Sequence, residues 1–338
     1  MTKEAMLYDV RAGDSVQCNL CAHRCTIAPS KQGLCAVREN REGRLYSLVY
    51  GRPVAQSVDP IEKKPLFHVY PGSRSYSIAT VGCNFQCTFC QNHDISQMPR
   101  ETGRITGRSV APGDIVEEAL KAGSRTIAYT YTEPTVFFEY ACDIGRIAHE
   151  RGIKNVFVSN GFMTGEALEA IAPVLDAVNC DLKAFSDDFY RRYCGGRLQP
   201  VLDSLKKMKE LGIWVEVTTL IIPSLNDSDD ELRAIARFIC SIGAETPWHI
   251  SRYFPRYRMR EPAPTPVETI HRAALIGKEE GLRYIYGGNV PGDASESTLC
   301  HHCGHLLIER CGYQIGTIDL EGTRCPRCHT EVAGIFSD

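Results

Sequence analysis

The chain has 338 residues, of which 43% are hydrophobic and 23% are charged, and its formal net charge is −3. This length can bury a large core and predicts one main domain with small additions. The lack of a basic excess argues against a nucleic-acid partner. No segment has the long uncharged apolar run of a signal peptide or membrane span, so we expect a cytoplasmic protein without membrane association. Its sixteen cysteines indicate metal ligation, because the cytosol keeps thiols reduced.

Residues 1–70 form a predicted Cys-rich N-terminal segment with a β-hairpin. Four cysteines lie close together in it, joined by turn-forming residues: Cys18, Cys21, Cys25 and Cys35. Four thiolates at this spacing can wrap one metal centre and hold together a segment too short to fold by itself. Structural zinc and an auxiliary iron–sulfur cluster both use such a ligand set, and the sequence does not choose between them.

Residues 71–290 alternate β-prone runs with helical patterns. The predicted strands lie at 76–81, 126–131, 155–158, 177–181, 214–221 and 249–253, and a last short strand at 283–286 extends the edge. The predicted helices begin near Gly113, Pro134, Thr164, Leu198, Asp227 and Pro266. Six βα units of this kind require a parallel sheet with helices outside it. The predicted fold class is therefore α/β, an incomplete (β/α)6 TIM-type barrel.

Three cysteines follow the first predicted strand at the spacing C-x3-C-x2-C: Cys83, Cys87 and Cys90. Thiolates are the usual ligands of iron–sulfur clusters, and a [4Fe–4S] cube normally has four of them. A cube held by three leaves one iron open for a substrate or cofactor. The alternative is a zinc knuckle in which His93 supplies the fourth ligand.

Polar residues also follow the other predicted strands. Parallel α/β sheets carry their sites at the carboxyl ends of strands, so these residues should meet the three cysteines at one mouth. The candidates for binding a cofactor there are Thr132, Glu133, Pro134, Ser159, Asn160, Asp181 and Lys183. Two alternatives stay open: Asp181 and Lys183 could form an ordinary surface salt bridge, and Asn160 could simply terminate its strand.

Residues 291–338 form a predicted C-terminal module. Two C-x2-C pairs, separated by a short β-prone stretch, predict the tetrahedral site of a zinc ribbon: Cys300, Cys303, Cys325 and Cys328. A single iron could use the same four sulfurs, so the identity of the metal stays open. The neighbouring histidines are interpreted as bystanders, because four cysteines already complete a tetrahedron.

The three-cysteine motif resembles that of the radical S-adenosylmethionine (SAM) superfamily. The barrel resembles pyruvate formate-lyase activating enzyme, and nearly the whole chain resembles the radical SAM enzymes of the AmmeMemoRadiSam system, from Cys18 through the run 59–66 to the terminal ribbon. The resemblance implies that Thr132-Glu133-Pro134 stands for the family's Gly-Gly-Glu-Pro, which receives the SAM amino group, with Tyr131 and Thr132 in place of the glycines. It also implies that Lys183 meets the SAM carboxylate and that Asp181 helps to hold a monovalent cation.

The resemblance further implies the reaction. A [4Fe–4S] cluster reductively cleaves SAM to a 5′-deoxyadenosyl radical, which abstracts hydrogen from a protein or small molecule that the sequence does not identify. The expected class is a radical SAM oxidoreductase or lyase-type enzyme. Its expected partners are a ferredoxin- or flavodoxin-like electron donor and Memo-like and AMMECR-like proteins. The alternatives are a glycyl-radical enzyme activating enzyme, although residues 94–113 contain no ferredoxin-type cysteines, and a non-catalytic metal-binding scaffold.

Overall fold

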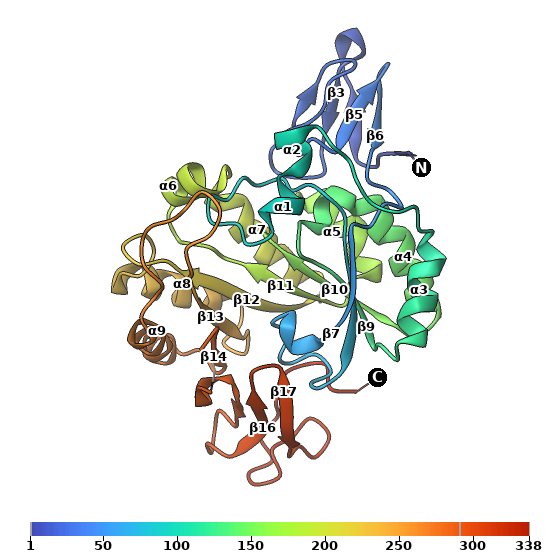
Figure 1. Cartoon of the computed structure of the whole chain (residues 1–338). Helices are drawn as coiled ribbons and strands as arrows, with labels where there is room; N and C mark the ends of the chain where they lie inside the picture. The colour runs from blue at the N-terminus through green and yellow to red at the C-terminus, as the bar shows by residue number, and fades with distance from the viewer. Residues whose placement is uncertain (1, 291, 338) are drawn as a thin grey trace.

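The computed structural model describes residues 2–290 and 292–337, and its core is one eight-stranded sheet (Figure 1). The edge strand β7 (Ala55–Pro60) pairs antiparallel with β8 (Arg74–Ala79). From β8 onward every neighbouring pair is parallel and the strands follow in chain order: β9 (Thr126–Tyr129), β10 (Lys154–Ser159), β11 (Ala177–Asp181), β12 (Trp214–Ile221), β13 (Trp248–Arg252) and β14 (Ile285–Gly288). The predicted parallel sheet is confirmed.

Helices cover the sheet and connect its parallel strands: α3 (Pro112–Lys121), α4 (Phe138–Glu150), α5 (Gly165–Ile171), α7 (Leu198–Glu210), α8 (Asp229–Ile242) and α9 (Val267–Glu279). Their starts follow from capping: the Ser228 hydroxyl accepts a hydrogen bond from the Glu231 amide at the start of α8. Helix α8 buries Leu232, Ile235 and Ile239, which recur at helical spacing on one face. None of the described helices is long and apolar enough to cross a membrane.

The main differences from the predicted elements lie at the edges of the sheet. Strand β7 was not predicted, because the run Ala55–Pro60 contains few apolar residues and only Asp59 in it is buried. Its hairpin with β8 crosses the predicted domain boundary at residue 70. The last strand begins at Ile285 and ends at Gly288, two residues later than predicted, and pairs with β13. An edge strand has one neighbour, so its sequence shows a weaker apolar pattern than an interior strand.

The N-terminal residues fold into two small antiparallel sheets, rather than the single predicted hairpin, and these lie at the top of the view beyond helix α2 (Met98–Thr102) (Figure 1). One contains β1 (Lys3–Glu4), β6 (Arg44–Ser47) and β5 (Arg38–Arg41), and β5 and β6 form a hairpin. The other contains β2 (Tyr8–Val10), β3 (Val16–Cys18) and β4 (Thr26–Ile27). The Nε2 atom of His23 lies 2.9 Å from the Asn84 carbonyl oxygen, so this region contacts the loop after β8.

The C-terminal module lies at the opposite end of the molecule and contains β15 (Thr298–Leu299), β16 (Leu306–Cys311) and β17 (Gln314–Ile318) (Figure 1). Pro291 and Asp338, where the predicted module begins and ends, lie outside the described residues. Arg310 donates to the Phe67 carbonyl oxygen at 2.7 Å, and the buried Glu216 carboxylate accepts from the amides of Phe67 and His68. The loop 67–68 thus joins the module to the barrel.

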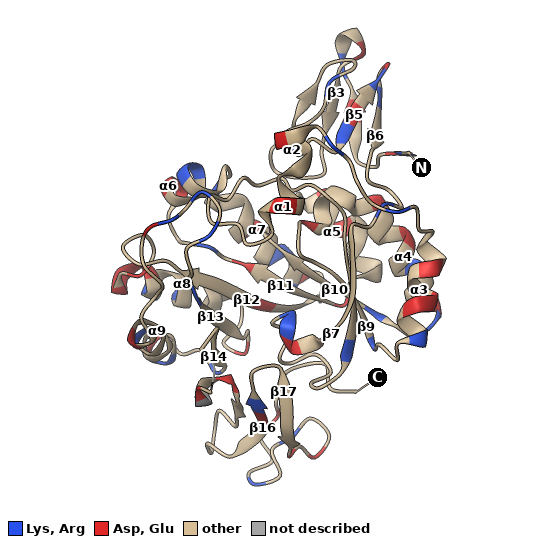
Figure 2. Ribbon diagram, in the orientation of Figure 1, with Lys and Arg blue, Asp and Glu red and all other residues tan. Residues whose placement is uncertain are grey.

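Charged residues of both signs are interspersed over the outer helices (Figure 2). On α3, for example, Lys121 pairs with Glu118 at 2.8 Å, and both side chains are exposed. Such exposed pairs contribute little to stability and keep the surface hydrated. The charged groups that matter for chemistry are the buried ones at the sheet's carboxyl edge.

Candidate metal and cofactor site

A cavity of about 410 Å³ lies at the carboxyl ends of the parallel strands. Except for Pro134, all the residues that were predicted to bind the barrel cluster or its cofactor line it: Cys83, Cys87, Cys90, Thr132, Glu133, Ser159, Asn160, Asp181 and Lys183. Pro134 is buried behind Glu133 as the first residue of the 3-10 turn η3 (Pro134–Phe137). Four separate loops therefore converge on one cavity, as the strand-end rule predicts.

The three cysteines of the loop after β8 are surrounded by groups that can donate to sulfur. The Phe85 amide lies 3.4 Å from Cys83 Sγ, and the Asn160 side-chain amide lies 3.8 Å from the same atom. The Ser96 hydroxyl lies 3.3 Å from Cys90 Sγ. Burial raises the pKa of the Cys83 thiol well above its ordinary value, so a thiolate at this position needs a cationic centre beside it. An iron–sulfur cluster fits this donor set.

The zinc-knuckle alternative does not fit the position of His93. Its ring stacks on Tyr257 with ring centroids 4.4 Å apart and an interplanar angle of 12°. Among the described residues, donor atoms of three or more metal-binding side chains lie within 4.8 Å of one another only at the C-terminal cysteines. The sulfurs of Cys83, Cys87 and Cys90 are therefore spread more widely than a tetrahedron around one zinc ion requires, about 3.8 Å per edge for Zn–S bonds of about 2.3 Å.

Glu133, at the end of β9, is a buried carboxylate with an ordered shell of donors. Its Oε1 accepts from the hydroxyls of Thr135 at 2.6 Å and Ser159 at 2.8 Å, and its Oε2 accepts from the Asn160 amide at 2.8 Å. Burial raises the pKa of Glu133, and these hydrogen bonds oppose the shift. The Asn160 side chain also bonds to Asn84 Oδ1 at 2.7 Å. Asn160 therefore links the carboxylate to the cysteine loop and does more than end its strand.

Asp181 and Lys183 form an ion pair of 2.8 Å at the end of β11. Only 13% of the Lys183 side chain is exposed, and both residues line the cavity, so the pair differs from an ordinary surface salt bridge. Burial alone would lower the pKa of Lys183, but Asp181 and the thiols of Cys87 and Cys194 outweigh it and raise the pKa well above its usual value. The cavity therefore contains a fixed cation next to carboxylates.

Tyr131, which the resemblance places at a glycine position of the family's motif, has a left-handed backbone with φ of 62°. Its carbonyl oxygen accepts from the Asn92 side chain at 2.7 Å, and its hydroxyl donates to Asp59. Lys64 lies over its ring, 4.5 Å from the centroid, and donates to Asp59 at 2.7 Å. Asp59 and Lys64 were not predicted to act at the site, and their only sequence signal was the run 59–66, which carried part of the family resemblance.

Asp59 is the anionic centre of that group. Burial alone would raise its pKa, but hydrogen bonds from Lys63, Lys64 and Tyr131 hold the pKa well below its usual range. Burial lowers the pKa of Lys64 to about 8, and Asp59 opposes this shift. The cation and anion are thus held together behind the Tyr131 turn, and both lysines line the cavity.

Cys194 is a further residue that the predictions left out. It ends the π-helical turn η5 (Tyr190–Cys194), whose last carbonyl oxygens accept hydrogen bonds from the amides of Gln86 and Thr88. A hydrogen bond from the Cys194 thiol lowers the pKa of Cys87, although burial opposes the shift. The loop that carries the cysteines is therefore supported by η5 on one side.

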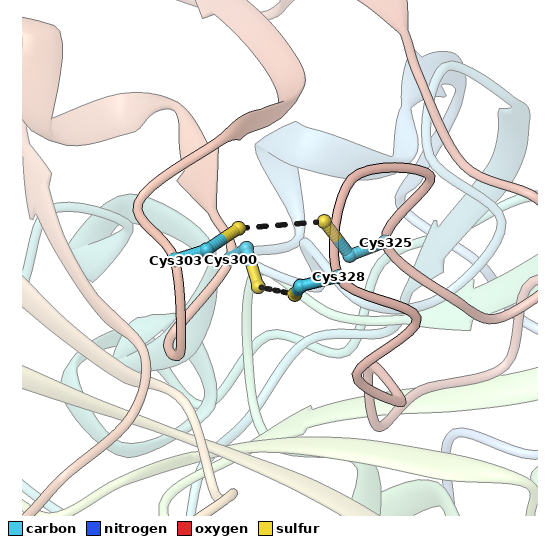
Figure 3. A group of neighbouring side chains, drawn as sticks. All are labelled: Cys300, Cys303, Cys325 and Cys328. Carbon is cyan, nitrogen blue, oxygen red and sulfur yellow. Dashed lines mark hydrogen bonds between the residues drawn. The ribbon is translucent and has the colours of Figure 1, made fainter.

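The four C-terminal cysteines form a compact group (Figure 3). The sulfurs of Cys300 and Cys328 are 3.5 Å apart, and those of Cys303 and Cys325 are 3.7 Å apart. These distances match the edge of about 3.8 Å expected for a tetrahedron of thiolates around a zinc ion, given Zn–S bonds of about 2.3 Å. The arrangement fits one metal ion with no open position.

The four N-terminal cysteines lie around a second, smaller cavity of about 20 Å³. Cys18, Cys21, Cys25 and Cys35 line it together with Arg38 and Asn84. Their sulfurs do not form a group within 4.8 Å, in contrast to those of the four C-terminal cysteines. Asn84 directly follows Cys83, so this cavity borders the loop that carries Cys83, Cys87 and Cys90, the cysteine triad.

Comparison with known proteins agrees with this geometry. The family model of the radical SAM superfamily matches residues 77–239. Uncharacterized protein MJ0808 of Methanocaldococcus jannaschii is 45% identical over 333 residues, 98% of each chain. Pyruvate formate-lyase-activating enzyme of Clostridium pasteurianum is 25% identical over 178 residues, 51% of this chain and 71% of that protein. The structure of Streptococcus suis SuiB bound to S-adenosylmethionine has a similar fold, with a TM-score of 0.51 at 13% identity over 68% of this chain and 53% of SuiB.

Proposed function

The chain belongs to the radical SAM superfamily, and we propose on that basis that it cleaves S-adenosylmethionine at a [4Fe–4S] cluster held by Cys83, Cys87 and Cys90. The observation that carries the proposal is the convergence of three spaced thiols, two carboxylates and the Lys183 ammonium on a single cavity. When bound, the cluster supplies the electron that splits SAM into methionine and a 5′-deoxyadenosyl radical able to abstract hydrogen.

The charges around the cavity support a role in holding SAM. An ammonium group requires a carboxylate and a carboxylate requires a cation, and both occur here as Glu133 and Lys183. Within the described part of the chain, the Oε2 atom of Glu133 accepts one hydrogen bond, from Asn160 at 2.8 Å, so it retains a lone pair for the SAM amino group. Lys183 has two N–H donors beyond the one that it gives to Asp181, and these can reach the SAM carboxylate.

The finer assignments belong to the same proposal. We assign zinc to the ribbon cysteines, where it holds the module together, because their sulfurs match a closed tetrahedron. The resemblance over nearly the whole chain supports membership of the AmmeMemoRadiSam group, with Memo-like and AMMECR-like partners and a ferredoxin- or flavodoxin-like electron donor. Co-purification of the tagged chain with those proteins tests the partners.

A second candidate function is the activation of a glycyl-radical enzyme. The identity of 25% to a protein named as a pyruvate formate-lyase-activating enzyme favours it. The two candidates differ in the molecule that loses the abstracted hydrogen: for an activating enzyme it is a glycine residue of the glycyl-radical enzyme, and for the first candidate it is an unidentified substrate. Incubation with a glycyl-radical enzyme, reductant and SAM would produce a protein-based glycyl radical, visible by electron paramagnetic resonance, only if the second candidate is correct.

The direct test of SAM cleavage is anaerobic reconstitution followed by detection of 5′-deoxyadenosine after addition of dithionite. We expect the wild type to form 5′-deoxyadenosine. The variant with Cys83→Ala, Cys87→Ala and Cys90→Ala should not form it, and should lose about four irons per chain, the content of one cube. Cys240→Ala, which changes a cysteine in α8 away from the three clusters of thiols, is the matched control. Equal iron and equal product in the triad variant would disprove the proposal.

A further inference from the structure

The N-terminal cysteines raise a question about the metal that they hold. Cys18 and Cys35 bracket the segment, and the four sulfurs line a cavity of about 20 Å³. A space of about 10–15 Å³ on this measure accommodates one water molecule, so the cysteines enclose a space and do not close directly on one another. Their wide spacing is shared with the triad after β8 and contrasts with the ribbon, where the sulfur pairs are 3.5 and 3.7 Å apart.

Arg38 provides a second, independent observation. It is 2% exposed and lines the same cavity. Its Nη2 atom donates to both oxygens of Glu139 at 2.7 Å, but Nε and Nη1 are buried with no hydrogen-bond partner in the described part of the chain. Buried guanidinium donors normally have acceptors, so an acceptor is expected in this cavity. The inorganic sulfides and thiolates of an anionic iron–sulfur cluster are acceptors of this kind.

The cavity is also tightly connected to the triad loop. A Cβ atom at Gly82 would lie 2.7 Å from Val37 and 3.5 Å from the Cys35 carbonyl oxygen, so the two loops are in direct contact there. Arg100 donates to the Leu34 carbonyl oxygen at 3.1 Å and to that of Cys83 at 3.3 Å. The N-terminal cysteines and the triad are therefore neighbours across one layer of backbone.

We propose that Cys18, Cys21, Cys25 and Cys35 hold a second iron–sulfur cluster, hydrogen-bonded by Arg38, and that it exchanges single electrons with the cluster of the triad. Each transfer oxidises one cluster and reduces the other by one electron, with no bond made or broken. The electron comes from a low-potential one-electron protein donor or, in the test tube, from dithionite. The electron exchange rests on the proposed function of the triad, whereas the presence of the second cluster does not.

The test of the cluster uses the triad variant, Cys83→Ala with Cys87→Ala and Cys90→Ala, because it leaves the N-terminal segment unchanged. The protein is purified anaerobically and analysed for iron, acid-labile sulfide and zinc. We expect about two to four irons with as many sulfides per chain, as in the two common cluster types, and about one zinc. Absence of iron together with about two zinc ions would overturn the proposal, and this result is independent of SAM cleavage.

A control addresses iron bound nonspecifically. Adding Cys18→Ser and Cys21→Ser to the triad variant should remove the remaining iron and sulfide, and unchanged iron would overturn the proposal. The role of Arg38 is tested in the same background by Arg38→Met with Glu139→Gln, which removes the buried ion pair as a unit. We expect the cluster to persist with a more negative midpoint potential, because the double variant keeps the net charge of the pair but loses the Arg38 N–H donors, and such donors stabilise the reduced cluster. An unchanged midpoint potential would contradict a hydrogen bond from Arg38 to the cluster.

Electron exchange is tested by electron paramagnetic resonance of the fully reduced wild type. Two reduced clusters separated by one layer of backbone should couple magnetically. The spectrum should therefore be broader than the sum of the spectra of the triad variant and of the Cys18→Ser, Cys21→Ser variant. A wild-type spectrum equal to that sum would refute the neighbouring position of the two clusters, on which the proposed electron exchange depends.

Discussion

Replacement of Lys183 by methionine removes one charge from the cavity and keeps most of the side-chain volume. Lys183 Nζ lies 2.8 Å from Asp181, and 13% of the side chain is exposed, so an anion bound next to it would be partly desolvated. One charge-assisted hydrogen bond contributes about 1.5–3 kcal/mol in such a setting. Since about 1.4 kcal/mol corresponds to a tenfold change, we expect the dissociation constant of SAM to rise roughly 10- to 150-fold.

The assay is anaerobic equilibrium binding of SAM to the reconstituted protein, with iron content and the visible absorption of the cluster measured in parallel. Lys183 is not a cysteine ligand, so both cluster readouts should match the wild type. Lys209→Met is the matched control: Lys209 forms an ion pair of the same length, 2.8 Å, with Glu245, its side chain is 22% exposed, and it does not line the cavity. This control should leave SAM affinity unchanged.

The double variant Lys183→Met with Asp181→Asn separates two explanations of a loss of SAM affinity in Lys183→Met. If Lys183 acts only by neutralising Asp181, the double variant regains the wild-type affinity. If Lys183 contacts SAM, the double variant stays weak. An unchanged dissociation constant for Lys183→Met, with full iron content, would refute the assignment of Lys183 to SAM.

Two further predictions concern the C-terminal module and the loop 67–68 that contacts it. Cys325→Ser leaves three thiolates, so the module should lose its metal and become sensitive to limited proteolysis, because metal binding supplies the folding free energy of so small a unit. The iron bound by Cys83, Cys87 and Cys90 should stay in place. A protease-resistant module without metal would contradict this prediction. Burial lowers the pKa of His68 to about 4, so between pH 6.5 and 4 the folded chain binds fewer protons than the unfolded chain, and stability should fall as the pH falls through this window by up to about 3 kcal/mol. The pH dependence of the urea midpoint, compared with that of His68→Gln, measures this loss, and equal slopes for the two proteins would refute it.

The interior strands could be predicted from sequence because the sheet is covered on both sides. All four residues of β9 are buried, and the observed bounds of β11 and β12 coincide with the predicted runs 177–181 and 214–221. A strand buried on both faces must be apolar almost throughout, and that signal is local. Strand β7 has no such signal, since it owes its place in the sheet to pairing with β8, which follows it after the connection 61–73.

The residues of the candidate site also divide into those that a local sequence pattern predicts and those that only tertiary contacts bring to the site. The strand-end rule was enough to bring Glu133 and Lys183 to the cysteine loop, because the positions of strand ends are set by the order of the sheet. The support from Asp59 and the unpaired donors of Arg38 could not be predicted. Asp59 is 72 residues from its partner Tyr131, and Arg38 is 101 residues from Glu139, and no local pattern records contacts over such separations.

The Tyr131 turn shows how a residue with a Cβ atom can hold the left-handed backbone that the resemblance implies for a glycine. A left-handed backbone costs a residue with a Cβ atom about 1–2 kcal/mol, which a glycine at this position avoids. Here the side chain that causes the penalty also makes contacts that offset it, since its hydroxyl donates to Asp59 and Lys64 lies over its ring. Asn92 adds a hydrogen bond of 2.7 Å to the carbonyl oxygen of the turn. Asp59, Lys64 and Tyr131 therefore act as one unit that replaces the conformational freedom of glycine with tertiary contacts, and a change in one of them alone should disturb the Glu133 loop more than a joint replacement of all three.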